Sequence, residues 1–288
     1  TLKKTIALLI AVLLLMMYAA AACAEIFVNQ PLPEDWNTRE TMRLTFFASG
    51  RTDAMMLETA GEVMMIDGGS AQYASKLINY MKSRGITHFK YLFNTHPHND
   101  HVQGLYKMVE AGFTADEFLS PFKINHKHSF QQKTVKVLKK AGIPYRQVYH
   151  GDVIQFGKAQ LHLYRWDELR TMNGMSGMLN IYFGDRRVLL CSDITGATQD
   201  FFMENVDVQE LQAEIVKAPH HGISGFDDKF VAAVNPQLII ATVPQKKGKR
   251  IELQSKGLGL PCMFSGDGRI EIETDGTDWY VTQFMGEF

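Results

Sequence analysis

The sequence lacks a net charge of either sign. Its 288 residues carry 30 Lys and Arg against 31 Asp and Glu, which gives a formal net charge of −1. This balance argues against a protein that coats nucleic acid through bulk charge, although a local basic groove stays compatible with it. Charge alone therefore names no partner.

Boundaries between domains are also missing. The chain has no low-complexity linker and no repeat of fixed period. Hydrophobic residues make up 45% of it and charged residues 21%, which is enough apolar material for a full core and argues against disorder. We therefore expect one catalytic domain over residues 25–288, built from two β-rich halves with helices outside.

Cysteine is scarce as well, with three residues in the whole chain. Cys23 belongs to the N-terminal segment described next. Cys191 and Cys262 could pair in an oxidising compartment or remain buried free thiols, and the sequence favours neither alternative.

Residues 1–24 differ in composition from the rest of the chain. Lys3 and Lys4 precede an apolar run, and Ala22-Cys23-Ala24 is the small-residue pattern that a signal peptidase recognises. We expect an export signal over residues 1–24 and an extracytoplasmic protein, secreted or attached to the surface of a bacterial cell. A retained membrane anchor and a lipoprotein signal on Cys23 stay as alternatives, and only these would bring contact with a membrane.

Hydrophobic periodicity predicts mixed secondary structure along the chain. Two short apolar runs, 54–58 and 62–66, indicate a hairpin, and residues 72–84, 102–111, 129–141 and 226–234 have the spacing of helices. The remaining apolar runs are predicted to be strands, at residues 42–48, 88–94, 145–149, 153–156, 160–165, 178–183, 187–191, 214–218, 237–242, 269–274 and 279–284.

Three imidazoles and a carboxylate lie within six residues, directly after the apolar run 91–93. His96 and His98, two residues apart in an irregular loop, can point to one side and bind one ion. Asp100 and His101, expected in the same loop, are placed to hold a second ion. The loop follows a strand end, where ligand sites of α/β proteins lie.

Further ligands follow two later strands. Asp193 comes after the apolar run 188–191, and His220 comes after 215–219, so both stand in the same relation to a strand as His96. The two oxygens of Asp193 suit it to bridge two ions. Of the adjacent histidines we choose His220 as the ligand, and we expect His221 to support the site or to contact substrate.

Taken together, these residues resemble the metallo-β-lactamase superfamily. The pattern comprises His96-x-His98-x-Asp100-His101, Asp67-Gly68-Gly69 before it, and Asp193 and His220 after it, and the resemblance covers residues 44–284. It implies an α+β fold, the αβ/βα four-layer sandwich, with a dinuclear metal site at one edge of the sheets. Residues 173–176, 189–193 and 220–224 are similar to the hydrolase domain of bacterial DNA-uptake competence proteins, and extracellular phosphorylcholine esterases are also comparable.

One feature of many superfamily members is missing. They have a further histidine ligand just before the strand that leads to the bridging Asp, where this chain has residues 172–176 without a histidine. The histidines in the preceding interval are His126, His128, His150 and His162. We therefore assign His96, His98 and Asp193 to one ion. The other receives Asp100, His101, His220 and the shared Asp193.

The expected chemistry is hydrolysis with two divalent ions, Zn²⁺ or alternatively Mn²⁺. A water that bridges them loses a proton near neutral pH and attacks as hydroxide. A phosphodiester or related phosphate ester, small or polymeric, fits such a site best. Beside the catalytic ligand Asp100, we expect polar contacts to substrate oxygens from His221, Asn173, Ser176 and Ser224.

Two other readings of the function stay open. Within the same superfamily the protein could hydrolyse β-lactams or lactones, and outside enzymology it could be a non-catalytic binding module at the cell surface. Two sequence features are assigned no role: residues 126–128 and the basic run 246–250 are expected to be solvated loops.

Overall fold

The computed structural model describes residues 24–169 and 171–288. The expected export signal lies outside these residues except for Ala24, and so does Cys23. Of the helices in the described part, none combines the length and the apolar character that crossing a membrane requires.

Two β-sheets form the centre of the molecule. Nine strands make the first sheet, in the order β1-β16-β15-β2-β3-β4-β5-β6-β7. From β4 to β7 the neighbours are parallel, whereas β16 to β4 are antiparallel. The bounds are β1 Ile26–Val28, β2 Met42–Phe46, β3 Ala54–Thr59, β4 Glu62–Gly68, β5 His88–Phe93, β6 Thr114–Ser120, β7 Tyr145–Gln147, β15 Gly268–Thr274 and β16 Trp279–Met285.

The second sheet has seven strands in the order β14-β13-β12-β11-β10-β9-β8. It is antiparallel from β8 to β11 and parallel from β11 to β14. The bounds are β8 Val153–Phe156, β9 Ala159–Tyr164, β10 Met178–Phe183, β11 Arg186–Leu190, β12 Ile215–Lys217, β13 Leu238–Ala241 and β14 Cys262–Phe264.

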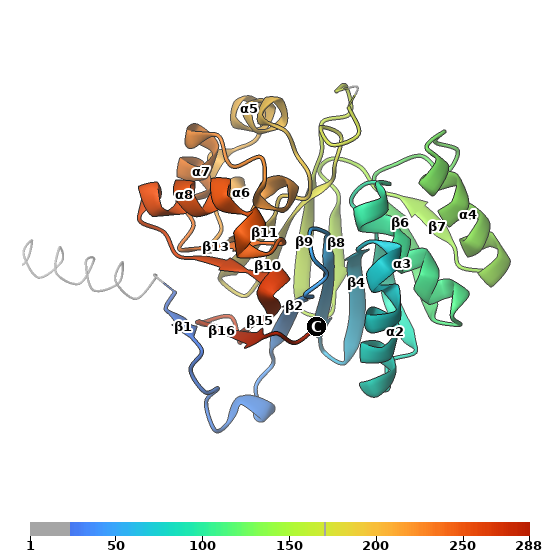
Figure 1. Cartoon of the computed structure of the whole chain (residues 1–288), viewed down its shortest axis with the longest axis horizontal. Helices are drawn as coiled ribbons and strands as arrows, with labels where there is room; N and C mark the ends of the chain where they lie inside the picture. The colour runs from blue at the N-terminus through green and yellow to red at the C-terminus, as the bar shows by residue number, and fades with distance from the viewer. Residues whose placement is uncertain (1–23, 170) are drawn as a thin grey trace, which may run out of the picture.

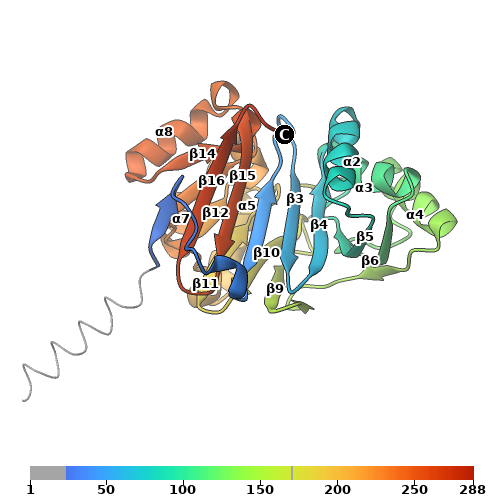
Figure 2. The ribbon, with the colours of Figure 1, turned by 90° about the horizontal axis from the view of Figure 1, so that it is seen from below.

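Helices cover the outer face of each sheet (Figures 1 and 2). On the first sheet lie α2 Ala74–Ser83, α3 Asn99–Glu110 and α4 Ser129–Ala141. On the second lie α5 Gly196–Asn205, α6 Val208–Leu211, α7 Asp228–Val234 and α8 Lys249–Leu258. One apolar cluster fills the space between the sheets, and one more lies under each helical layer. The expected four-layer sandwich is confirmed.

The differences from the predicted elements have identifiable causes. The hairpin β3–β4 and helices α2, α4 and α7 lie where they were expected, but β1, β6, β14, α5, α6 and α8 were not predicted. Strand β6 contains charged residues in its first half, and β14 has only three residues. Helix α8 begins with Lys249 and Arg250, so part of the basic run expected to be a loop is helical.

Both interior cysteines are free. Cys191 follows β11 and Cys262 begins β14, which lies three strands away in the same sheet. Three strand spacings amount to roughly 14 Å, about twice the Cα separation that a disulfide allows. The geometry of the sheet therefore excludes the disulfide.

The parallel strands of the two sheets end at a common edge, with their loops facing one another (Figure 1). A close backbone contact fixes α3 at this edge. The Gly104 N–H donates a hydrogen bond of 2.9 Å to the Gly69 carbonyl. A Cβ built on Gly104 would overlap the carbonyl oxygen of Gly68, so the crossing requires glycine.

This crossing generates a stability prediction. Gly104→Ala should lower the free energy of unfolding by about 1–3 kcal/mol, because the new methyl group forces α3 away from β4. The matched control is Gly257→Ala in α8, where a Cβ meets nothing within 4 Å. This substitution should stabilise the helix by roughly 0.5–1 kcal/mol. Urea unfolding of the metal-free proteins measures both, and equal effects would contradict the steric argument.

Candidate metal centre

The first ligand group comes from the end of β5 and the start of α3. His96 and His98 lie in the connecting loop, with His98 as the N-cap of α3. Asp100 and His101 lie in the first helical turn, not in the loop where they were expected. The helix begins three residues before the predicted Val102, because polar residues form a first turn that apolar periodicity does not reveal.

Asp193 lies at the centre of four imidazoles. Its Oδ2 is 3.6 Å from Nε2 of His96 and 3.6 Å from Nε2 of His220. Its Oδ1 is 3.3 Å from Nε2 of His101 and 3.6 Å from Nε2 of His221. Each carboxylate oxygen therefore faces one pair of histidines, and the centre has two halves.

The structure divides the ligands between the two halves as expected, except that His221 takes the place expected for His220. Ligand atoms of His96, His98 and Asp193 lie within 4.8 Å of one another, as do those of Asp53, His101, Asp193 and His221. The expected grouping placed His220 with Asp100 and His101. Instead, Nε2 of His221 lies 3.4 Å from Oδ2 of Asp100, and His220 lies on the side of His96.

The cause lies in the backbone. His220 and His221 have φ values of 48° and 59°, both in the left-handed region. Asp67 and Ser192 share this conformation, so four of the non-glycine residues with positive φ lie at the centre. Such residues cost about 1–3 kcal/mol each and persist where the surroundings enforce them. Here the strained backbone directs adjacent side chains to different oxygens of Asp193.

Asp67 orients His101. Its Oδ2 accepts a hydrogen bond of 2.7 Å from Nδ1 of His101. The same carboxylate accepts hydrogen bonds from Thr95 N–H at 2.8 Å, Thr95 Oγ1 at 2.6 Å and Asn94 Nδ2 at 2.9 Å. Donation from Nδ1 leaves Nε2 as the atom that can bind a cation. This contact explains the position of the Asp-Gly-Gly motif.

Asp53 orients His221 in the same way, although it was not among the predicted site residues. Its Oδ1 lies 2.9 Å from Nδ1 of His221 and accepts a hydrogen bond from Thr242. Its Oδ2 forms an ion pair with Lys217, which also donates a hydrogen bond of 2.9 Å to the Ser192 carbonyl. Asp53 and Lys217 are both 0% exposed. The feature of the sequence that could have pointed to this buried ion pair is a lysine inside the otherwise apolar strand β12.

The electrostatics follow from these contacts. Burial alone would lower the pKa of His101, but Asp193 and Asp67 raise it well above its usual value. Burial would also lower the pKa of His221, but Asp193 and Asp53 outweigh burial, so this pKa is raised as well. Burial lowers the pKa of His96, His98 and His220. The metal-free centre therefore keeps protons on His101 and His221 to higher pH than free imidazole does.

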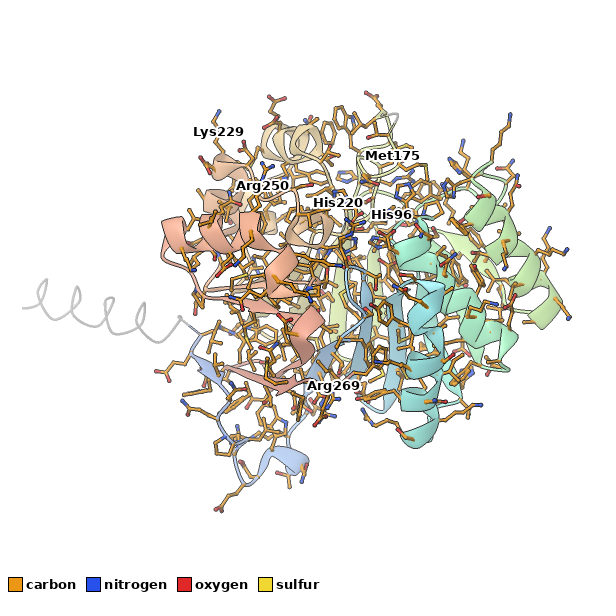
Figure 3. All side chains as sticks on the ribbon, in the orientation of Figure 1. His96, Met175, His220, Lys229, Arg250 and Arg269 are labelled. Atoms are coloured by element: carbon orange, nitrogen blue, oxygen red, sulfur yellow. The ribbon has the colours of Figure 1, made fainter. Side chains whose placement is uncertain are left out.

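The expected substrate contacts come from the loop before β10. Asn173 Oδ1 and Ser176 Oγ are buried and have no hydrogen-bond partner among the described residues. The next residue, Gly177, donates a hydrogen bond of 3.0 Å to the Thr95 carbonyl, which places this loop against the end of β5. Figure 3 shows Met175 of the loop beyond His96 and His220.

The other expected contacts lie closer to the imidazoles. Ser224 Oγ is 2.9 Å from Nδ1 of His220. His128, which was expected in a solvated loop, is half-buried with its ring centroid 5.6 Å from that of His98. His128 is therefore part of the wall of the centre.

The donor set fits a divalent cation. Nε2 of His96, His101 and His221 and Oδ1 of Asp193 are buried atoms without a hydrogen-bond partner in the described part of the chain. Buried polar atoms are normally paired, and these four lie together around the carboxylate of Asp193. Imidazole nitrogen and carboxylate oxygen are ligands that zinc and its neighbours accept.

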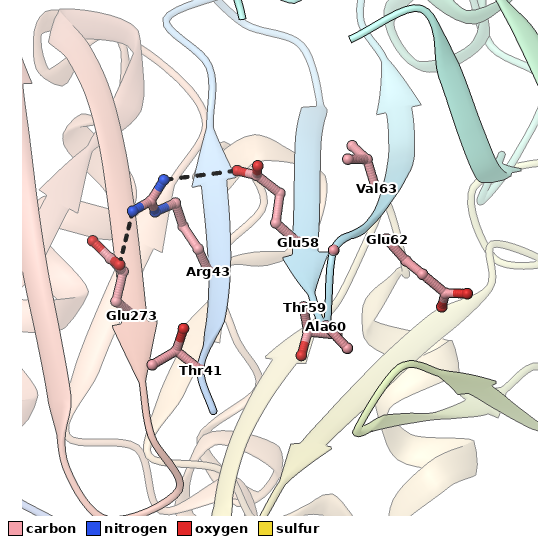
Figure 4. A pocket seen from close by; sticks show the side chains of 9 residues that line it. Thr41, Arg43, Glu58, Thr59, Ala60, Glu62, Val63 and Glu273 are labelled. Carbon is pink, nitrogen blue, oxygen red and sulfur yellow. Dashed lines mark hydrogen bonds and ion pairs between the residues drawn. The ribbon is translucent and has the colours of Figure 1, made fainter. Parts of the chain in front are cut away.

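A separate hollow of about 240 Å³ lies on the outer face of the first sheet (Figure 4). Arg43 extends across it and pairs with Glu273 at 3.0 Å and with Glu58 at 4.0 Å. Because its charges are already paired with one another, this hollow offers no comparable binding group.

Comparisons with known proteins agree with the geometry. A sequence model described as the metallo-beta-lactamase superfamily matches residues 49–225, which is more than half of the chain. No curated protein matches the sequence.

Two solved structures share the fold. The metallo-beta-lactamase fold protein YhfI from Bacillus subtilis is 13% identical with a TM-score of 0.58, over 82% of this chain and 100% of that one. The diiron beta-hydroxylase CmlA from Streptomyces venezuelae is 13% identical with a TM-score of 0.52, over 85% of this chain and 55% of that one. The present chain thus spans about half the length of CmlA, and these likenesses concern the fold alone.

The buried ion pair generates a second stability prediction. Lys217→Met should destabilise the fold by about 3–5 kcal/mol, because Asp53 is left buried without its cation. The double variant Lys217→Met/Asp53→Asn removes both charges and should recover most of this loss. Urea unfolding measures both effects. If the double variant were as unstable as the single one, packing rather than charge would explain the loss.

The raised pKa values of His101 and His221 predict the pH dependence of metal binding. Imidazole binds a metal only when deprotonated, so the ion must displace protons that these residues keep to higher pH than free imidazole does. Zn²⁺ affinity should therefore increase with pH and reach a plateau once both residues are deprotonated. Calorimetric titration in two buffers of different ionisation enthalpy counts the protons. Binding near neutral pH without proton release would refute this assignment.

Proposed function

The chain belongs to the metallo-beta-lactamase superfamily, and on this premise we propose that it hydrolyses phosphodiester or related phosphate ester bonds with two divalent metal ions. The superfamily assignment, made from the sequence, is confirmed, and the chain has a metallo-hydrolase fold with a candidate metal centre. The finer similarity to competence-protein hydrolase domains and phosphorylcholine esterases stays a prediction.

The observation that supports two ions is the position of Asp193 between two pairs of imidazoles. We assign His96, His98, His220 and Asp193 to the first ion. The second ion would receive Asp100, His101, His221 and the shared Asp193. In this assignment His220 takes the place of the histidine that the sequence lacks before β10, and each ion has four protein ligands.

When bound, the two ions would activate water for attack and neutralise charge on substrate oxygens. The residues of the chain hold and orient this centre. Asp67 and Asp53 fix the ring planes of His101 and His221 through Nδ1, and such outer contacts typically change metal affinity about 10–100-fold. Asn173 and Ser176 offer buried polar atoms that can bind oxygens of the substrate.

The charge of the centre favours an anionic ester. Four buried or half-buried carboxylates, those of Asp53, Asp67, Asp100 and Asp193, are offset by the one ammonium of Lys217. Before a bound water loses its proton, two divalent ions would exceed the remaining three negative charges by one. A loaded centre would therefore attract a phosphate ester more strongly than a neutral lactone or amide. The donor set accepts Zn²⁺ and also Mn²⁺, and we propose zinc.

Export is part of the same proposal. It rests on the sequence of residues 1–24, and it would place the enzyme outside the cytoplasm, either secreted or held at the surface of a bacterial cell. Its substrate would then be an anionic ester available in that compartment.

Metal-loaded protein and a panel of substrates test the function. We expect an aryl phosphodiester to be hydrolysed with supplied Zn²⁺ or Mn²⁺, and His98→Ala to lower kcat by more than about 100-fold with the circular dichroism spectrum unchanged. The matched control is His162→Ala, whose ring packs on Tyr182 in the second sheet at 4.3 Å, and which should keep full activity.

Other outcomes of this panel would replace the proposal. Rapid turnover of a chromogenic cephalosporin or a lactone, with none of the phosphodiester, would assign the alternative hydrolase chemistry. Absence of turnover with every substrate, together with an unchanged biological phenotype for His98→Ala, would indicate a non-catalytic binding module.

A further inference from the structure

The basic residues of the chain are unevenly distributed. Residues 118–151 contain six lysines and one arginine but no aspartate or glutamate, although the whole chain has a net charge of −1. We call the six lysines the α4 basic face. Its members are Lys123, Lys127, Lys133, Lys136, Lys139 and Lys140.

The α4 basic face is exposed and its charges are not neutralised locally. All six lysines are exposed, and none has an ion pair among the described residues. Two acidic groups on the packed neighbours are already engaged in other ion pairs. Glu110 of α3 pairs with Lys107 at 2.7 Å, and Glu117 of β6 pairs with Arg146 at 2.9 Å. The face therefore presents unpaired positive charge to the solvent.

Helix stability does not account for this pattern. Lys139 and Lys140 lie in the last turn of α4, where the helix dipole favours cations. Lys123 and Lys127 precede the helix, near the end where the dipole disfavours them. Their presence there requires another reason, such as a negatively charged partner.

The α4 basic face begins at the metal centre. His128 is the N-cap of α4, and its ring lies 5.6 Å from that of the proposed ligand His98. Helix α4 packs beside α3, whose first turn carries Asp100 and His101. The face then follows α4 for 13 residues, roughly 20 Å, along the outer side of the molecule (Figure 1).

We propose that the α4 basic face is a docking surface for a linear phosphodiester polymer, which it binds through the backbone phosphates and leads to the metal centre. This inference rests on the proposed function and makes the substrate polymeric. A small ester could not contact lysines spread along the whole helix. An anionic membrane is less suited as a partner, because Ile124 alone among the large exposed hydrophobic side chains of the described residues lies between these lysines, and none lies on α4.

Binding through phosphates has a measurable signature in its salt dependence. Each contact to a single strand contributes about 0.7 to the slope of log affinity against log salt concentration. The triple variant Lys127→Gln/Lys136→Gln/Lys140→Gln should therefore reduce the slope by about 2 and weaken binding roughly tenfold or more at low salt. The matched control is Lys246→Gln/Lys247→Gln/Arg250→Gln, which removes equally exposed charges near α8, on the opposite side of the molecule.

Fluorescence anisotropy with two labelled probes, a single-stranded oligonucleotide and a base-free polyglycerol phosphate, measures this binding. The full chain is used in the His98→Ala background, so that turnover does not consume the probes. We expect the α4 variant to lose affinity equally for both probes and the α8 control to bind within twofold of the parent. In the otherwise wild-type, metal-loaded protein, hydrolysis of a small aryl phosphodiester should stay within twofold for both variants.

Several results would overturn the docking surface. These are unchanged polymer binding by the α4 variant, equal losses by the α4 variant and the control, loss for the oligonucleotide alone, or binding to anionic vesicles in place of either polymer. Hydrolysis of the small ester reports separately on the proposed function. If that hydrolysis is absent while the α4 variant loses polymer affinity, the catalytic proposal fails and the docking surface stands.

Discussion

The constraint on which this structure depends is the collection of like charges in a place with little water. Asp53, Asp67 and Asp193 are buried within one centre together with three fully buried imidazoles. Each carboxylate is tolerated only because specific donors face it, namely Lys217 and His221 for Asp53, Thr95 and His101 for Asp67, and four imidazoles for Asp193. The two sheets and their helices serve to hold these donors in place.

Much of this architecture follows from the sequence. The hydrophobic periods predict most strands and four of the helices, and the cluster at residues 96–101 with Asp193 identifies the centre. Local patterns could not provide the partnership of Asp53 with His221, because those residues are 168 positions apart. Local patterns also could not show that His220 and His221 face different halves of the centre. That arrangement depends on their two left-handed backbone conformations, which any histidine pair could adopt or avoid.

The missing histidine before β10 has a structural counterpart. Sequence comparison alone suggests an ion with three protein ligands, whereas the strained turn at 219–222 brings a second imidazole to each oxygen of Asp193. Backbone strain of about 1–3 kcal/mol per residue is affordable in a molecule with three extensive apolar clusters. A compact two-residue motif can thus replace a ligand that other chains would draw from a separate loop.

The origin of the ligands in both halves of the chain has a mechanical consequence. The described part has no disulfide, so no covalent link joins the sheets other than the chain itself. An ion held by His96 and Asp193 would close a loop of about a hundred residues and act as a removable crosslink between the sheets, comparable in its entropic effect to a disulfide of that span. In such a molecule, the supply of metal would set how readily the two halves separate.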